Sequence, residues 1–260
     1  MIQKEICSMR LAEITLTVLL ASLSVNAFPD EVSDMEARIK EQMAAPDRHA
    51  WDLRRDIPRK PFETFQFLGL REGMVAMDIG AYAGYTTEML SAAVGQGGTV
   101  YMQNTQEVIK EYAEGYYDRT IAERLANNRL PNVKLHVREY DDLGLQDEVD
   151  MAFLGNLIHD FYYRDGEEKA LRFLASIRTA LKPGGVLGVM DHVGDSDQPN
   201  GKLHRIDPDV ARDLLGRAGF KIEAESELFV NSKDDHTLMV YDETVYLQTD
   251  RFLFRAISPD

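Results

Sequence analysis

Short apolar runs alternate with stretches of helical periodicity through most of the chain, starting near residue 74. Strands are predicted where the apolar runs occur, at residues 74–79, 99–103, 133–137, 149–154 and 186–190. Helices are predicted where apolar residues recur at intervals of three or four, at residues 86–94, 106–127 and 167–181. Repeated alternation of strand and helix is typical of a parallel sheet covered by helices on both faces.

The alternation changes at both ends of this region. Late in the chain, Asp207 and Gly219 predict the start and the end of a helix. Strands at 220–224 and 251–256 then follow with no helix between them, so we expect an antiparallel pair at one edge of the sheet. Before the sheet, residues 34–45 predict an amphipathic helix. We therefore expect a helical extension or lid over 28–70 and an α/β domain over 71–260.

The first 27 residues have the features of a secretory signal peptide. Basic Lys4 and Arg10 precede an apolar run at 14–23, and Val25-Asn26-Ala27 has the small-x-small pattern of a cleavage site. We expect cleavage after Ala27, export to the periplasm or the medium, and no stable membrane insertion afterwards. An uncleaved membrane anchor and an ordinary helix of a cytoplasmic protein are the alternatives.

Charge and cysteine content exclude several classes of function. The chain has 260 residues, a formal net charge of −15 and a single cysteine, Cys7. An acidic protein repels a phosphate backbone, so we expect no nucleic-acid partner. One thiol forms neither an intrachain disulfide nor a cysteine-based zinc site. A small-molecule substrate and a monomer or small homo-oligomer are expected.

A glycine turn follows the first predicted strand, in the order Asp78-Ile79-Gly80-Ala81-Tyr82-Ala83-Gly84. Ligands of open α/β sheets bind at the carboxyl ends of the strands, and glycine lets the backbone approach them closely. The spacing lacks the Gly-x-Gly-x-x-Gly of nicotinamide cofactor sites. A packed turn without a ligand is the alternative interpretation.

Together with this turn, Leu181-Lys182-Pro183-Gly184-Gly185 before the fifth strand and Ala218-Gly219-Phe220 before the sixth resemble class I S-adenosylmethionine (AdoMet)-dependent methyltransferases. More closely, residues 45–257 resemble an uncharacterised group of predicted methyltransferases with signal peptides. The resemblance implies a Rossmann-like sandwich with a mostly parallel seven-stranded sheet and an antiparallel edge strand. Further matching stretches are 59–61, 78–90, 156–160, 181–192, 204–207, 234–236 and 249–252.

The resemblance also implies AdoMet as the cofactor. It assigns cofactor binding to Arg59, Asp78, Gly80, Ala81, Tyr82, Gly84, Asn104, Glu139, Tyr140 and Asn156. Arg59 would meet the methionine carboxylate, or else form a surface salt bridge with Asp56. The chain departs from the family at two positions, because Tyr82 replaces a glycine and Asn104 replaces the acid that binds the ribose. Glu139 would meet the adenine amine, although the neighbouring Asp141 and Asp142 also suit a solvated turn.

Candidate proton acceptors gather after the fourth and fifth strands: His159, Asp160, Asp191, His192 and His204. Histidine titrates near neutral pH, so His159 or His192 suits the removal of a substrate proton. Structural hydrogen bonding is the alternative for each histidine. A set of Asp191, His192, His204, Asp235 and His236 offers divalent-cation ligands, but its spacings match no compact metal motif, and we expect no metal site.

These features predict an AdoMet-dependent methyltransferase that acts on a small molecule. A non-catalytic exported binding protein on a methyltransferase scaffold is the alternative, because AdoMet is made and used in the cytoplasm. Metal-assisted chemistry by the Asp/His set is a third hypothesis.

Overall fold

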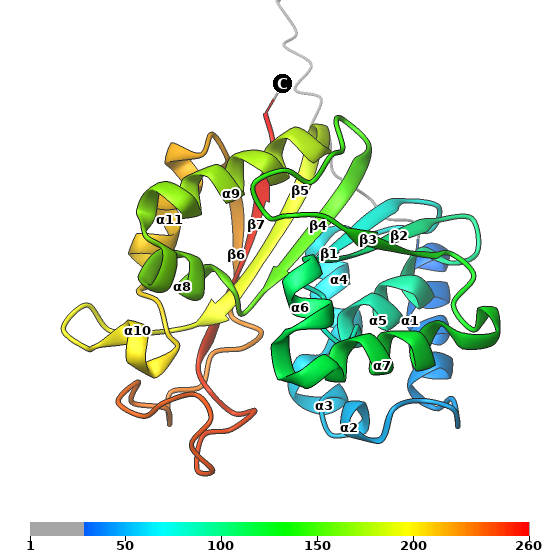
Figure 1. Cartoon of the computed structure of the whole chain (residues 1–260), viewed down its shortest axis with the longest axis horizontal. Helices are drawn as coiled ribbons and strands as arrows, with labels where there is room; N and C mark the ends of the chain where they lie inside the picture. Colours follow the sequence, from blue (N-terminus) through cyan, green and yellow to red (C-terminus); the bar gives the residue numbers. More distant parts are fainter. Residues whose placement is uncertain (1–28, 260) are drawn as a thin grey trace, which may run out of the picture.

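The computed structural model describes residues 29–259 (Figure 1), so the predicted signal peptide and Cys7 lie outside the described residues. Seven strands form one sheet: β1 (Val75–Ile79), β2 (Thr99–Asn104), β3 (Val133–Val137), β4 (Val149–Gly155), β5 (Leu181–His192), β6 (Lys221–Ser226) and β7 (Arg251–Ile257). Their order in the sheet is β3-β2-β1-β4-β5-β7-β6. The predicted Rossmann-like sandwich is confirmed.

The antiparallel pairing expected near the end of the chain is also present. β7 runs antiparallel to both β5 and β6, whereas the pairs from β3 to β5 are all parallel. β6 has no helix between it and β7, as the sequence predicts, and it forms the outer edge of the sheet beyond β7.

β5 begins earlier than its apolar run predicts. Val149 of β4 lies opposite Leu181 and Met151 lies opposite Val186, so residues 182–185 bulge out of the ladder. Gly184 at φ 74° closes this turn, as the Pro-Gly pair predicts. The bulge also contacts the residue that follows β7, because the Gly184 N–H donates to the Ser258 carbonyl over 2.8 Å.

Helices cover both faces of the sheet (Figure 1): α1 (Pro29–Met43), α2 (Ala50–Leu53), α3 (Asp56–Arg59), α4 (Pro61–Leu68), α5 (Tyr85–Val94), α6 (Gln106–Lys110), α7 (Tyr116–Leu125), α8 (Ile158–Asp160), α9 (Glu167–Ala180), α10 (Asn200–Leu203) and α11 (Pro208–Arg217). Helices α8, α9 and α11 pack with Met77 and Ile79 of β1 on one face. Helices α1, α4 and α5 pack with Ala76 of β1 on the other face. The alternation of side chains along a strand explains why adjacent residues of β1 serve different cores.

The prediction that residues 106–127 are mostly helical is confirmed, but the region is not one continuous helix. The chain forms α6, a 3-10 turn at Tyr112–Gly115 and then α7, with Gly115 at φ 71° capping the start of α7. A left-handed residue ends helical hydrogen bonding, and glycine adopts that conformation without steric cost. The break places three tyrosines, described below, beside the glycine turn.

A buried ion network joins the N-terminal helices to the sheet. Glu88 of α5 pairs with Arg124 and, over 2.5 Å, with Arg129. Arg124 also donates to Asp52 of α2 over 2.6 Å and to the Ala83 carbonyl in the glycine turn over 2.6 Å. This network therefore fixes α2 and α7 around the turn.

Within residues 29–259, none of the helices combines the length and apolar character needed to cross a bilayer.

We expect Glu88→Gln to lower the free energy of unfolding by about 1–3 kcal/mol, because it removes the counter-charge shared by buried Arg124 and half-buried Arg129, which keep only Asp52 and Asp47 as carboxylate partners. Urea denaturation followed by circular dichroism measures the change. Glu167→Gln is the matched control, since Glu167 pairs with Arg217 at the surface and its loss has little effect. Equal losses in the two variants would contradict a structural role for the network.

Candidate functional site

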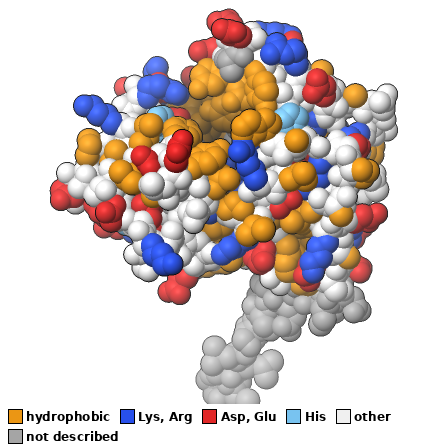
Figure 2. Space-filling view, turned by 90° about the horizontal axis from the view of Figure 1, so that it is seen from below, with side chains coloured by type: hydrophobic (Ala, Val, Ile, Leu, Met, Phe, Trp, Pro, Cys, Tyr) orange, Lys and Arg blue, Asp and Glu red, His pale blue; other side chains and the backbone are white. Residues whose placement is uncertain are grey.

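A cavity of about 590 Å³ opens at the carboxyl ends of β1, β4 and β5. In Figure 1 these strand ends face the lower part of the molecule, and Figure 2 looks onto that end, where hydrophobic side chains border a hollow. The order of the sheet reverses between β1 and β4, which is where open α/β sheets bind ligands. The volume is within the usual range for small-molecule sites.

The glycine turn forms one wall of this cavity, as predicted, with Asp78, Gly80, Ala81, Tyr82 and Gly84 all in the lining. Gly80 and Gly84 have φ of 60° and 85°. A Cβ on Gly80 would lie 2.5 Å from Leu157 Cδ2, and one on Gly84 would lie 2.6 Å from Met102 Cε. Both glycines are therefore favoured by conformation, and a Cβ at either position would also displace the end of a neighbouring side chain.

Asn104 does not reach the cavity. Its Oδ1 accepts a hydrogen bond from the Tyr82 N–H over 2.8 Å, and its Nδ2 donates to the Tyr82 carbonyl over 3.2 Å. The side chain is fully buried, and both of its polar atoms have partners. In this structure the Asn104 amide holds the backbone of the turn, so the predicted ribose contact would require these two hydrogen bonds to be exchanged.

Glu139 and Tyr140 also lie outside the cavity lining. Glu139 is exposed on the segment after β3. Tyr140 packs edge-on against Phe161 and Phe173, with ring centroids 4.8 and 5.3 Å apart. Tyr140 therefore packs against the core beneath the turn, and the adenine contact stays a prediction for a segment outside the cavity lining.

Opposite charges meet at the base of the turn. Burial raises the pKa of the Asp78 carboxyl to about 6, against the opposing effects of a 2.6 Å hydrogen bond from Thr87 and the nearby Arg59 guanidinium. Burial lowers the pKa of Arg251 to about 10, and the neighbouring Arg59 adds to this. Two guanidinium groups so close together favour an anion between them.

Arg59 lines the cavity, as predicted, and does not pair with Asp56. Asp56 instead forms a two-armed ion pair with Arg48, at 2.7 and 2.8 Å, and accepts a hydrogen bond from the Tyr85 hydroxyl. The surface salt bridge considered for Arg59 is therefore ruled out. The Arg59 guanidinium lies over the Tyr85 ring at 5.1 Å and is left facing the cavity.

Asn156 contributes a polar atom without a partner. It follows β4, lines the cavity and has φ 54°, a conformation that asparagine tolerates better than most residues. Its Oδ1 is buried and accepts no hydrogen bond within the described residues. A buried acceptor of this kind is normally satisfied, so Asn156 suits a ligand that supplies an N–H or O–H donor.

Asp191 and His159 form a buried pair behind the cavity wall. The His159 Nδ1 lies 2.8 Å from Asp191 Oδ1, and the backbone N–H groups of His159 and His192 also donate to this carboxylate. Burial opposes the charging of His159, but Asp191 outweighs it, and the pKa of His159 is raised above its usual value. Asp191 does not line the cavity, so it positions His159 rather than touching a ligand.

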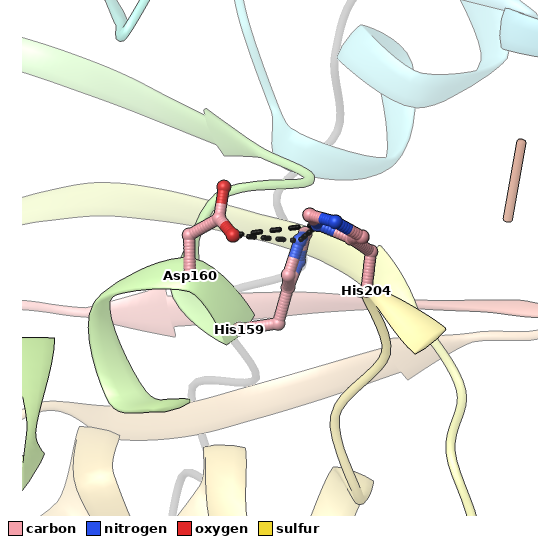
Figure 3. Close-up of side chains that lie close together, drawn as sticks. All are labelled: His159, Asp160 and His204. Carbon is pink, nitrogen blue, oxygen red and sulfur yellow. Dashed lines mark hydrogen bonds and ion pairs between the residues drawn. The ribbon is translucent and has the colours of Figure 1, made fainter. Parts of the chain in front are cut away.

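Three of the predicted residues converge at the cavity surface (Figure 3). His159 Nε2, Asp160 Oδ1 and His204 Nδ1 lie 3.3 to 3.5 Å from one another. His204 arrives from the end of α10, where φ of 54° turns its ring toward His159. The prediction that these residues meet at one edge of the sheet is confirmed.

The larger metal set considered from the sequence is not assembled. Burial lowers the pKa of His192 to about 3, and its Nδ1 lies 2.7 Å from Thr249 Oγ1, so this ring is a neutral structural partner in the cavity wall. His236 pairs with Asp195 and Asp250 at 2.9 and 3.0 Å, away from the cavity. Asp235 is exposed and accepts from Thr237.

Sequence reasoning missed Arg251 and most of the aromatic lining. Aromatic side chains line the cavity at Trp51, Tyr82, Tyr85, Tyr112, Tyr116, Tyr117, Phe153, Tyr241 and Tyr246. Tyr82 packs against Tyr117 with ring centroids 5.3 Å apart, and Tyr112 stacks on Tyr117. The grouping of Tyr112, Tyr116 and Tyr117 around Gly115 was the sequence pattern that could have predicted an aromatic lining.

Comparisons with known proteins support the fold. No protein-family model matches the chain, and no curated protein sequence matches it either. A SAM-dependent methyltransferase from Aquifex aeolicus matches with a TM-score of 0.56 at 21% identity, over 85% of this chain and 97% of that chain. The [4+2]-cyclase SpnF matches with a TM-score of 0.60 at 16% identity, over 88% and 94%. A putative sarcosine dimethylglycine methyltransferase from Galdieria sulphuraria matches with a TM-score of 0.55 at 11% identity, over 78% and 86%. The chain has the fold of SAM-dependent methyltransferases.

The double hydrogen bond from Asn104 gives a direct test of its role in the turn. Asn104→Asp removes the donor to the Tyr82 carbonyl and buries a charge, so we expect the free energy of unfolding at pH 7 to fall by about 1–3 kcal/mol. Thermal denaturation measures the change. Asn127→Asp, at an exposed position, should leave stability near the wild-type value. An Asn104→Asp protein as stable as the wild type would show that the amide is not needed.

Proposed function

We propose that the chain is an AdoMet-dependent methyltransferase that acts on a small molecule in this cavity. The observation that carries the proposal is the glycine turn Gly80–Gly84, which opens onto the cavity at the β1/β4 switch point of a methyltransferase fold. Two features of the lining fit the cofactor. The turn has no room for a Cβ on Gly80, and Asn156 Oδ1 is an acceptor without a partner.

The methionine end of the cofactor matches the charges on this wall. Arg59 and Arg251 would hold its carboxylate, since both guanidinium groups line the cavity and neither faces a carboxylate partner there. Asp78 and Asn156 would accept hydrogen bonds from its ammonium group, and that positive charge would favour the ionised form of Asp78. When bound, the cofactor supplies a methyl group on a sulfonium.

The acceptor would occupy the aromatic part of the cavity. Tyr112, Tyr117 and Tyr241 offer ring faces and edges, which suit a flat, largely apolar molecule. The polar end of this part is formed by His159, Asp160 and His204. We propose that the acceptor presents its ionisable group to these three side chains, which favour its deprotonated form, and that Asp191 keeps His159 in place.

We also propose that the protein is exported, acts as a monomer or small homo-oligomer and binds no nucleic acid. The support is the pattern of basic, apolar and small residues over 1–27 and the net charge of −15.

Calorimetry with the full chain tests the proposal. We expect AdoMet and S-adenosylhomocysteine to bind with one site per chain. Gly80→Ala should weaken both by at least about tenfold, because a Cβ at φ 60° adds roughly 1–2 kcal/mol of strain and meets Leu157. Gly97→Ala is the matched control, since a Cβ there meets nothing within 4 Å. Absence of binding to the wild type would end the proposal.

A second function is favoured by one specific observation. Tyr82 and Asn104 bind each other where the adenosine end of the cofactor is expected, and neither Asn104 nor Glu139 lines the cavity. A methyltransferase scaffold that binds another small ligand would have these features. The fold also occurs in SpnF, which is a [4+2]-cyclase.

Tyr82→Gly separates the two functions. Tyr82 has φ 50°, a conformation that costs a tyrosine roughly 1–3 kcal/mol, and glycine relieves this strain while removing the ring. The second function predicts no AdoMet binding by the wild type and measurable binding by Tyr82→Gly. Tyr82→Phe, which keeps the ring, should behave as the wild type does. Titration calorimetry on the three proteins gives the result, and wild-type binding would reject the second function.

A further inference from the structure

His159, Asp160 and His204 form a nearly equilateral triangle of ligand atoms. His159 Nε2 lies 3.3 Å from His204 Nδ1 and 3.5 Å from Asp160 Oδ1, and His204 Nδ1 lies 3.4 Å from the same oxygen. Figure 3 shows the three side chains close together, two of them from α8 and His204 from the residue after α10. All three line the cavity.

The size of this triangle matches a metal coordination shell. Zinc binds imidazole nitrogen at about 2.0–2.1 Å and carboxylate oxygen at about 2.0–2.2 Å. Ligands at those distances in a tetrahedron are separated by about 3.3–3.5 Å from one another. The three measured separations fall in that range, so the ligand atoms are spaced as a tetrahedral coordination shell requires.

The three ligand atoms also require a cation or a proton between them. His159 Nδ1 faces the ionised carboxylate of Asp191 at 2.8 Å and serves as a donor to it. In the neutral ring, Nε2 then presents a lone pair to Asp160 Oδ1, another acceptor. Two acceptors at 3.5 Å repel each other unless a cation or a proton lies between them.

Asp191 supplies the support that metal-binding histidines commonly have. A histidine ligand usually donates its second ring nitrogen to a carboxylate, which fixes the ring and increases the basicity of the ligand atom. Asp191 is fully buried and is itself held by the backbone N–H groups of His159 and His192. His159 is therefore rigid in the orientation that a metal would use.

We propose that His159 Nε2, Asp160 Oδ1 and His204 Nδ1 bind a divalent transition-metal ion, with an open coordination position facing the aromatic cavity. Two imidazoles and one carboxylate favour an ion such as Zn²⁺, Co²⁺ or Fe²⁺ over Mg²⁺ or Ca²⁺. Three protein ligands leave a position for substrate, which is typical of catalytic rather than structural sites. The proposal differs from the expectation from sequence that the chain has no metal site.

The role of the metal in methyl transfer rests on the proposed function, whereas the binding of the metal is independent of the proposed function. A hydroxyl group of the acceptor at the open position would lose its proton to water more readily beside the cation. With AdoMet bound, the O–CH₃ bond would form as the S–CH₃ bond breaks, which would give S-adenosylhomocysteine and leave the metal oxidation state unchanged. The aromatic lining places such a hydroxyl on a ring-containing molecule.

Metal titration of the full chain, stripped with chelator, tests the site. We expect calorimetry with Zn²⁺ to show one tight site per chain and Mg²⁺ to show none. Co²⁺ should give the visible absorption of a low-coordinate nitrogen- and oxygen-ligated ion. His204→Asn and Asp160→Asn should abolish both signals, and asparagine suits position 204 because it tolerates φ 54°. Asp191→Asn should weaken Zn²⁺ binding about 10- to 100-fold.

His49→Asn is the matched control, because His49 lines the opposite wall of the same cavity and asparagine can also cap α2. It should bind Zn²⁺ as the wild type does. No Zn²⁺ site in the wild type, or equal binding by His204→Asn, would overturn the proposal and leave a shared proton as the link between the rings. AdoMet binding distinguishes the failure of one proposal from the failure of the other. If His204→Asn binds AdoMet but not Zn²⁺, both proposals are supported. If the wild type binds Zn²⁺ but not AdoMet, only the metal site is supported.

Discussion

The buried charge of Glu88 is the constraint on which the cavity depends. A carboxylate in the helix layer needs cations, and here Arg124 and Arg129 reach it from distant parts of the chain. Arg124 also connects Glu88 to α2 and to the glycine turn, since its other nitrogens donate to Asp52 and to the Ala83 carbonyl. One ion network therefore sets the distance between the N-terminal helices, α7 and the glycine turn, which are three walls of the cavity.

A second buried carboxylate organises the opposite wall. Asp191 at the end of β5 accepts hydrogen bonds from the backbone of His159 and His192 and from the His159 ring. It thereby fixes the first residues after β4 against the end of β5. Both carboxylates hold distant segments of the chain together. They differ in their effect on the cavity, because Glu88 is neutralised by arginines, whereas Asp191 binds one nitrogen of His159 and leaves the other facing the cavity.

Local patterns in the sequence were enough to predict the strands and the turn. Apolar runs fixed β1 to β4 to within two residues, and in β1, β2 and β4 the cause is burial of most residues on both faces. Gly80 and Gly84 were predictable because their φ angles and the space around them exclude other residues. Asn104 was not predictable, because its partner is the backbone of Tyr82, and no side-chain pattern shows which groups a folded turn leaves unpaired. The meeting of His159 with His204, 45 residues apart, likewise needed the fold.

The two departures from the methyltransferase pattern have one physical cause. Tyr82 occupies a left-handed conformation, and a residue there turns its N–H and carbonyl toward the end of β2. An amide at position 104 complements both groups, whereas a carboxylate would leave the carbonyl unpaired. Tyr82 and Asn104 therefore form one coupled pair, and a ligand that needs either group must compete with their mutual hydrogen bonds. Arg59, Asp78 and Asn156 line the cavity, so under the proposed function ligand recognition would be concentrated on these three residues.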